Sequence, residues 1–485
     1  MWLGTFLAIL AFIFFILKSV LSWLYQIRNN PRGPLPIPWY GNRMPKDVHP
    51  GLCKWYEQMR AKYGNIFTVY QGSQPTIIVN GFNAVNELLI NHGAVVHTRP
   101  SESGNLSFLH DNTGLVWNNR TYKSLRRISS AALKPFGLYS STESSSSEKL
   151  SDLLDSLEKN NITDISAALR VTVSDNICAR IFGIDKQMAF PEVVRLHHAA
   201  LGTLENMVPF LRAPALRYIP GLAHYWRNCI KGKEAFKTFL KQALKDHEDS
   251  IDSATIGENF FDNFLQHNRT QRASRLDNED CFATVMQLML AGLDAIHGTL
   301  MWLFLYVSLN PQIQDRMAEE ILSQIGLHSC PTTKHMSVMP YCMSVIFETI
   351  RISNAAFTSL PYTSQQDISI ENVRIPAHSS ILINLVSVNK DPETFKDPET
   401  FNPDRFMDKD GNLRTIQKFL PFSTGRRSCL GESFSKANIF TTVVRVLQRY
   451  ELCRVSEEEY STDSTPGFLS TPAPYKLQYI PRTWE

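Results

Sequence analysis

The sequence predicts a mainly α-helical protein with small β-sheets, an α+β fold, preceded by an N-terminal transmembrane helix. Residues from about 115 to 350 follow a helical pattern that loops interrupt. Residues 65–80 instead alternate or run in β-branched side chains around Gly72-Ser-Gln-Pro75, which predicts a β-hairpin. Short strands are also expected at 368–386 and near 475–480. The body of the chain is therefore predicted to hold many helices and a few small sheets.

The N-terminal residues predict a membrane anchor. Residues 1–17 carry no charge and are almost all apolar, and the apolar run resumes after Lys18. As a helix, residues 1–25 would span about 37 Å, enough to cross a bilayer core. A cleaved signal peptide is the weaker alternative, because no basic residue precedes the run and no small-x-small cleavage site follows it. We expect an anchor at 1–25, a proline-rich hinge at 26–45 and the main domain at 46–485.

Charge and cysteine usage limit the classes of function. The formal net charge of +3 over 485 residues gives no nucleic-acid footprint. The eight cysteines contain no CxxC pair, so neither a zinc site nor a disulfide framework is indicated. Such usage fits a reducing compartment. The positive charges near the apolar run, Lys18, Arg28 and Arg32, all follow it, which predicts that the main domain faces the cytosol.

One glycine-flanked loop carries the strongest chemical signal. It precedes a helix-like segment at 432–450 and reads Phe422-Ser-Thr-Gly425-Arg-Arg427-Ser-Cys429-Leu-Gly431. The glycines let backbone approach a flat ligand, while nearby amide groups and the helix dipole favour a thiolate. A thiolate with open space above it is what a haem iron needs for oxygen activation. The alternative is a buried structural cysteine, the commoner fate of a lone cysteine.

The loop matches the cysteine loop of the cytochrome P-450 family, Phe-x-x-Gly-x-Arg-x-Cys-x-Gly, at every fixed position. The chain resembles that family over residues 31–485. This resemblance implies the cytochrome P-450 fold, a haem b whose iron is bound by Cys429, and a single-pass monooxygenase of the endoplasmic reticulum membrane. Electrons would come from NADPH through a diflavin reductase, and one atom of O2 would enter a lipophilic small molecule.

Two further motifs resemble parts of this family. Glu348-Thr-Ile-Arg351 places an acid and a base on one helix face at i and i+3. Alone, such a pair is most often a solvated surface ion pair. The second motif, Phe401-Asn-Pro-Asp-Arg405-Phe406, precedes the cysteine loop. In the family these acids and bases form a buried network behind the haem, so the resemblance implies a structural role for Glu348, Arg351 and Arg405.

The propionates of a haem need cationic or hydrogen-bonding partners. Arg427 matches the propionate arginine of the family, and Tyr122-Lys-Ser-Leu-Arg126 matches its Trp-x-x-x-Arg with tyrosine in place of tryptophan. A phenol still donates a hydrogen bond from a rigid aromatic body. Tyr362 stands where many relatives have a propionate-binding histidine, although an ordinary strand tyrosine is nearly as good a reading. The resemblance therefore places these residues around the haem with the loop residues Phe422, Gly425 and Gly431.

A long helix is expected at about 278–308, on the oxygen side of the haem. It contains Ala291-Gly-Leu-Asp294-Ala295, where the family has Ala/Gly-Gly-x-Asp/Glu-Thr. The resemblance implies that Asp294 relays protons and that the hydroxyl which steadies bound oxygen is missing at Ala295. A substrate hydroxyl or ordered water could replace it, or Thr299 could serve through water from one turn further on. Alternatively, the enzyme does not activate O2 reductively at all.

Three functions therefore stay open: a monooxygenase, an isomerase or dehydratase that uses a preformed peroxide without a reductase, and a haem-binding sensor or sequestering protein. His297 is expected to be a packed or surface histidine. We expect a cationic face that would steer an acidic flavoprotein, formed by Lys123, Arg127, Lys418, Arg426 and Lys436. The equal alternative is that these residues belong to an ordinary solvated charged face.

Candidate substrate-pocket positions are the 100–115 loop, the 200–215 region, Leu290 to Ala295, Ala355 to Leu360, and Phe468-Leu469. Their apolar content indicates a steroid, fatty acid, terpenoid or foreign compound, and it does not choose among them.

Overall fold

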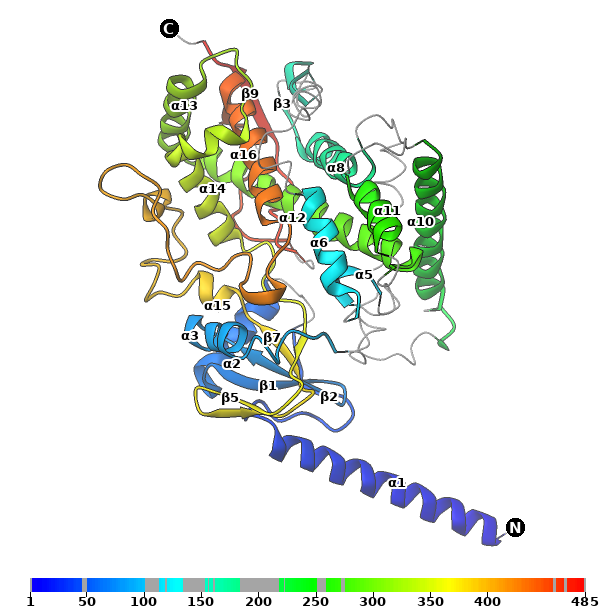
Figure 1. Ribbon diagram of the computed structural model, residues 1–485. Helices are drawn as coiled ribbons and strands as arrows, with labels where there is room; N and C mark the ends of the chain where they lie inside the picture. The colour runs from blue at the N-terminus through cyan, green and yellow to red at the C-terminus, as the bar shows by residue number, and fades with distance from the viewer. Residues whose placement is uncertain are drawn as a thin grey trace.

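The computed structural model describes residues 2–45, 50–100, 113–117, 120–133, 153–155, 157–159, 162–183, 218–221, 223–250, 259–271, 275–456, 459–465 and 469–483. Of the predicted pocket positions, most of the 100–115 loop, the 200–215 region and Phe468 lie outside the described residues. Figure 1 shows a helical part above a smaller part that contains sheets, with helix α1 projecting from the sheet end.

The long helices are α1 (Trp2–Asn29), α2 (Gly51–Tyr63), α6 (Tyr122–Leu133), α8 (Ser166–Phe182), α10 (Ala223–Ser250), α11 (Phe260–Thr270), α12 (Asn278–Leu309), α13 (Pro311–Ile325), α14 (Pro340–Ser353) and α16 (Glu432–Arg449). Shorter helical segments are α3 (Phe82–Asn86), η1 (Glu87–Asn91), α5 (Gly114–Trp117), η5 (Thr333–Ser337), α15 (Val386–Asn389), η6 (Pro403–Phe406) and η7 (Gly425–Arg427). The mainly helical body predicted for 115–350 is confirmed where that range is described.

The largest sheet has the strand order β1-β2-β7-β4. Strands β1 (Ile66–Gln71) and β2 (Gln74–Val79) form the predicted hairpin, with Ile66 opposite Val79. Strand β7 (Ser380–Ile383) runs parallel to β2, and β4 (Tyr362–Thr363) runs antiparallel to β7. The smaller sheets are β3 (Ile162–Thr163) with β9 (Leu477–Pro481) and β8 (Tyr450–Arg454), and β5 (Ile368–Ile370) with β6 (Val373–Ile375).

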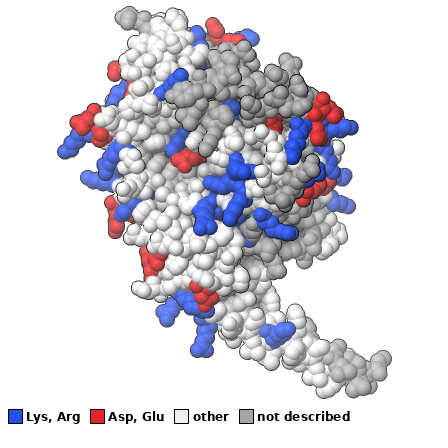
Figure 2. All heavy atoms as spheres, viewed as in Figure 1, with Lys and Arg blue, Asp and Glu red and all other residues white. Residues whose placement is uncertain are grey.

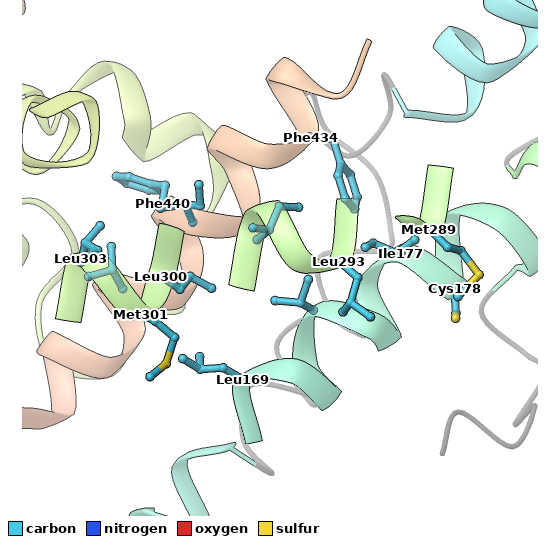
Figure 3. Close-up of a cluster of buried hydrophobic side chains, with 14 of the residues drawn as sticks. Leu169, Ile177, Cys178, Met289, Leu293, Leu300, Met301, Leu303, Phe434 and Phe440 are labelled. Carbon is cyan, nitrogen blue, oxygen red and sulfur yellow. The ribbon is translucent and has the colours of Figure 1, made fainter. Parts of the chain in front are cut away.

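Helix α12 forms the centre of the helical part and lies where the sequence predicts it. The side chain of Asp277 caps its first turn by accepting from the amide of Asp280 at 2.7 Å. Figure 3 shows Leu293 of α12 lying toward α8, while Phe434 and Phe440 of α16 approach from the other side. These side chains are almost fully buried, and each contributes about 1.5–3 kcal/mol through its removal from water. The core therefore fixes α12 between α8 and α16.

The proline-rich segment after α1 packs against the first sheet. The Asn42 side chain donates to the carbonyl of Pro34 at 2.9 Å and accepts from the amide of Tyr70 at 2.6 Å. A Cβ at Gly33 would overlap the carbonyl oxygen of Thr68, so only glycine fits there. Helix α1 itself continues past Tyr25 to Asn29, into the range expected to form the hinge.

Within the described part of the chain, α12 is the helix whose length and hydropathy would suit a membrane span. Two thirds of that apolar stretch is buried inside the body, so α12 is a core helix. The anchor predicted at residues 1–25 remains a proposal.

Candidate active site

The cysteine loop turns sharply through η7. Ser423 and Gly425 both adopt positive φ angles, +59° and +79°. The amide of Cys429 donates to the carbonyl of Phe422 at 2.9 Å, which closes the loop on itself. A Cβ at Gly425 would lie 2.7 Å from the carbonyl oxygen of Leu89 in η1. Glycine is needed at 425 for its backbone angle and for this approach to η1, whereas the sequence predicted an approach to a flat ligand.

Cys429 is an exposed residue, although protein atoms surround its sulfur. Desolvation raises the pKa of this thiol above its ordinary value, while the amide of Gly431, which donates to the sulfur, opposes that rise. The positive charges of Arg126 and Lys436 also favour the thiolate, and Glu432 disfavours it. A metal ion bound to such a sulfur deprotonates it outright. The predicted amide contact is confirmed, and the loop is suited to a metal-bound thiolate.

Arg427 and Tyr122 form one wall beside the cysteine loop. The guanidinium of Arg427 lies 3.4 Å from the centre of the Tyr122 ring and donates to the carbonyl of His97 at 2.9 Å. The hydroxyl of Tyr122 donates to the carbonyl of Arg426, and Arg126 donates to the carbonyl of Ser428 at 3.0 Å. The structure therefore brings together Tyr122, Arg126 and Arg427, as the sequence predicts.

A third arginine, Arg99, joins this group and was not identified from the sequence. It is 7% exposed, donates to the carbonyls of Leu360 and Pro361 at 2.9 Å each, and lies 4.3 Å from the centre of the Tyr362 ring. No motif marks Arg99. It reaches this place because the neighbouring Thr98 pairs with Thr363 in an isolated β-bridge, a long-range contact that spacing does not reveal.

Arg99 and Arg427 create a positive field inside the protein. Desolvation, followed by the charge of Arg99, lowers the pKa of Arg427 to about 10. Desolvation also lowers the pKa of Arg99. Two buried guanidinium groups that repel one another are suited to bind a ligand with carboxylates between them. Together with the exposed Cys429, this donor set fits a haem, whose propionates and iron need these two kinds of partner.

The acid–base network behind the loop has the predicted members. Glu348 and Arg351 are both fully buried and form a two-point ion pair, with nitrogen–oxygen distances of 2.7 and 2.8 Å. Arg405 reaches the same carboxylate at 3.3 Å. The amide of Asn402 also donates to Glu348, at 2.8 Å. The predicted buried network is confirmed, and the surface ion pair considered as its alternative is wrong.

This network connects to the cysteine loop through Asn389 and a group of phenylalanines. Arg351 donates to the carbonyl of Asn389 at 3.3 Å, and the Asn389 side chain accepts from the amide of Leu420 at 3.1 Å. Leu420 stands two residues before the loop begins at Phe422. The ring of Phe419 packs 5.0 Å from that of Phe406 in η6, between centroids. Displacing Arg351 would therefore disturb the start of the cysteine loop.

On α12, Asp294 faces α8. Its carboxylate forms an ion pair of 2.6 Å with Arg170, and about a quarter of each side chain is exposed. Since successive helical residues are about 100° apart, Asp294 and Ala295 point in clearly different directions. Ala291 and Ala295 share a face, and Ala291 is exposed even though most of α12 is buried. The accessible part of α12 thus includes Ala291 and Ala295, while the nearby carboxylate of Asp294 is engaged by Arg170.

Thr299 and His297 are both buried on α12. The hydroxyl of Thr299 donates to the carbonyl of Ala295 at 2.8 Å within the same helix. The Nε2 atom of His297 lies 3.1 Å from both the hydroxyl and the carbonyl oxygen of Ser166. His297 is therefore a packed histidine, and the Thr299 hydroxyl is already engaged.

Comparison with known proteins gives consistent matches along nearly the whole chain. The sequence model described as Cytochrome P450 matches residues 31–479. "Cytochrome P450 2C16" of Oryctolagus cuniculus is 30% identical over 471 residues, which cover 93% of this chain and 94% of the relative. "Cytochrome P450 2C8" of Homo sapiens is 28% identical over 492 residues, which cover 98% of each.

Proposed function

The chain belongs to the cytochrome P450 family, and we propose that it is a membrane-anchored monooxygenase that inserts one atom of O2 into a lipophilic small molecule. Members of this family are oxidoreductases that bind haem through a cysteine thiolate. The observation that carries the proposal is the exposed Cys429 in the same loop as the buried Arg427, on which the charge of the buried Arg99 acts. When bound, haem supplies the oxygen activation, and the chain supplies the ligand, the position and the protons.

We assign the holding of haem to residues on three elements. Cys429 would bind the iron, with the amide of Gly431 supporting its thiolate. Arg126 on α6 would bind the propionates together with Arg427 of the loop, whose guanidinium is supported by the ring of Tyr122. Arg99, above the ring of Tyr362, adds a further buried charge that acts on Arg427.

Proton supply is assigned to Asp294, with Arg170 as its holding partner. The carboxylate reaches solvent on the α8 side, so it can exchange protons there. To pass a proton toward the face of Ala295, it must leave Arg170 or act through water. The hydroxyl of Thr299 donates to Ala295, which makes it a poor substitute for the missing threonine. A water molecule or a substrate hydroxyl is therefore the proposed replacement.

A cationic surface over α6 is the proposed contact for an NADPH-dependent diflavin reductase. Figure 2 shows Lys and Arg side chains gathered near the middle of this face, where α6 lies in Figure 1. Lys123, Arg127 and Arg426 are exposed. Lys436 is less suited to this role, because Glu432 pairs with it at 2.6 Å. An acidic partner would be steered toward this surface, with a rate that falls as salt is added.

Helix α1 is the proposed single-pass anchor in the endoplasmic reticulum membrane, with the main domain in the cytosol. The support is the apolar run of residues 1–17, followed by Lys18, Arg28 and Arg32. Alkaline carbonate extraction of membranes tests this proposal: the full chain should stay in the pellet, and its release into the supernatant would refute the anchor.

Two measurements test the proposed function. The reduced protein under carbon monoxide should show the spectrum of a thiolate-bound haem, and Cys429→Ala should abolish it; an unchanged spectrum in the variant would refute the role of Cys429. A screen of lipophilic compounds with reductase, NADPH and labelled O2 should then find a product that contains one labelled atom. Substrate turnover with no label and no need for reductase would refute the monooxygenase.

Ala295 favours one second candidate, an isomerase or dehydratase that acts on a preformed peroxide. Such chemistry does not need the proton-delivering hydroxyl that this chain lacks. Ala295→Thr separates the two candidates. If a water molecule takes the place of the missing hydroxyl in the parent enzyme, the variant should leak less peroxide per NADPH consumed. Unchanged or greater leakage would favour substrate assistance or the second candidate, and turnover of an organic peroxide without reductase would identify the latter.

A further inference from the structure

Helix α5, only four residues long, is held by α12 through its backbone. Three successive amides each donate to a different α12 side chain: Gly114 to Asp280 at 3.1 Å, Leu115 to Thr284 at 3.1 Å, and Val116 to Gln287 at 2.8 Å. The first amides of a helix have no partner within the helix, so they need such acceptors when buried. In α5 these acceptors come from another helix.

The three acceptors form a row on α12. Asp280, Thr284 and Gln287 stand at positions i, i+4 and i+7, which share one helix face. Their exposed fractions are 2%, 0% and 4%, so the whole row is shielded from water. The Gln287 side chain also donates to the carbonyl of Thr113 at 3.0 Å, which fixes the entry to α5.

The other side of α5 is held by Arg427. Its Nη1 atom donates to the carbonyls of Leu115 and Val116 at 3.2 and 3.4 Å. A Cβ at Gly114, where φ is +79°, would lie 2.8 Å from the Gln287 side chain, so the backbone of α5 sits directly on the row. Helix α5 therefore connects α12 on one side to the loop arginine beside Cys429 on the other.

We infer that Thr284 and Gln287 are positioning residues for the haem site, because they hold α5 in the place from which its carbonyls orient Arg427. Loss of either side-chain acceptor leaves a buried amide without its partner, and α5 must shift or rotate to recover one. Arg427 then loses both carbonyl acceptors of its Nη1 atom and is oriented less firmly, by the carbonyl of His97 and the ring of Tyr122 among its contacts in the described residues. The haem should consequently dissociate faster. This inference rests on the proposed role of Arg427 as a propionate residue.

The test measures the rate at which haem leaves the full-length holoprotein for an excess of apomyoglobin. Thr284→Val keeps the shape of the side chain and removes the hydroxyl, so haem loss should accelerate by about tenfold. Thr284→Ser restores the hydroxyl and should restore the rate. The matched control is Thr172→Val on α8. Among the contacts of the described residues, the hydroxyl of this buried threonine donates only to Ala168 of its own helix. The rate of this variant should stay near that of the parent. Equal rates in all three variants would overturn the inference.

Gln287→Leu provides a second variant in case Thr284→Val does not fold. Arg427→Gln distinguishes the proposed role of Arg427 from the inferred role of the residues that position it. If Arg427→Gln leaves haem loss unchanged, the proposed role of Arg427 is wrong. If Arg427→Gln accelerates haem loss and Gln287→Leu does not, the positioning inference is wrong. When both accelerate it, Gln287→Leu should add little to Arg427→Gln, because both changes act through the same side chain. Fully additive effects would contradict the connection through α5.

Discussion

The neutral form of His297 should make the stability of the protein depend on pH. Burial, followed by the charge of Arg170, lowers the pKa of His297 to about 4. The backbone of Ser166 and the carboxylates of Asp294 and Asp164 oppose the shift without cancelling it. Protonating this histidine would place a second cation beside Arg170 in a site where His297 is only 4% exposed. The folded protein therefore resists a proton that the unfolded chain accepts.

The magnitude follows from the difference between the two pKa values of His297. Its folded-state pKa of about 4 lies below the ordinary 6.5, so the unfolded chain takes up the proton first as pH falls. The stabilisation is fully present above about pH 6.5 and is lost progressively between about pH 6.5 and 4. At 1.36 kcal/mol per pKa unit, the loss is about 2 kcal/mol at pH 5 and about 3 kcal/mol below pH 4.

Urea unfolding of the full chain in detergent, at pH 8 and pH 5, measures this effect. The comparison is with His297→Gln, which keeps an amide able to bond Ser166 and has no proton to gain. The other histidines titrate in both proteins, so they cancel in the difference. Between the two pH values, the parent should lose about 2 kcal/mol more unfolding free energy than the variant. An equal loss of unfolding free energy in the parent and in the variant would show that His297 does not cause this pH dependence.

Three other variants probe the site. Arg351→Leu leaves Glu348 buried with a weaker partner, so the free energy of unfolding should fall by about 3–5 kcal/mol and purified protein should contain less haem; near-parental stability would show that Arg405 suffices alone. Tyr122→Phe removes one hydrogen bond to Arg426, which should lower the unfolding free energy by about 1 kcal/mol while the haem spectrum is kept; loss of haem would mean that the hydroxyl binds a propionate directly. Arg170→Gln releases Asp294, so peroxide leakage should fall by up to about fivefold. Arg170→Lys keeps the charge and should change the leakage little. Rising leakage in both variants would contradict the role of Arg170 as a holding partner.

The fold was predictable where local pattern decides the structure. Helix α12 lies within a residue of its expected end because Asp277 is a good N-cap and the apolar run that follows is unbroken. The hairpin of β1 and β2 was marked by β-branched residues around a glycine turn. Strand β8 was not predicted, because its five residues follow directly on α16 and pair only with the distant β9. Pairing between remote segments leaves no local trace.

The same limit applies to the site. Glu348 and Arg351 are three residues apart on one helix, so their pairing followed from spacing. Arg405, the other cationic partner of Glu348, came from the family pattern. Arg99 and Arg170 were missed, since each meets its partners only through tertiary packing: Arg99 through the bridge to Thr363, and Arg170 through the contact of α8 with α12. Charge partners from distant elements are the part of a site that sequence spacing cannot supply.

Under the proposed function, proton delivery on α12 meets two obstacles: the ion pair that holds Asp294 and the missing hydroxyl at Ala295. An ion pair whose side chains are about a quarter exposed contributes about 1 kcal/mol, because solvent screens it and each ion keeps part of its hydration. Opening it therefore changes the population of free Asp294 by about fivefold at most. General acid–base catalysis by a positioned group is worth about 100-fold or more. The missing hydroxyl at Ala295 is thus the larger obstacle to proton delivery, and whatever replaces it, a water or a group on the substrate, should set how efficiently this enzyme uses O2.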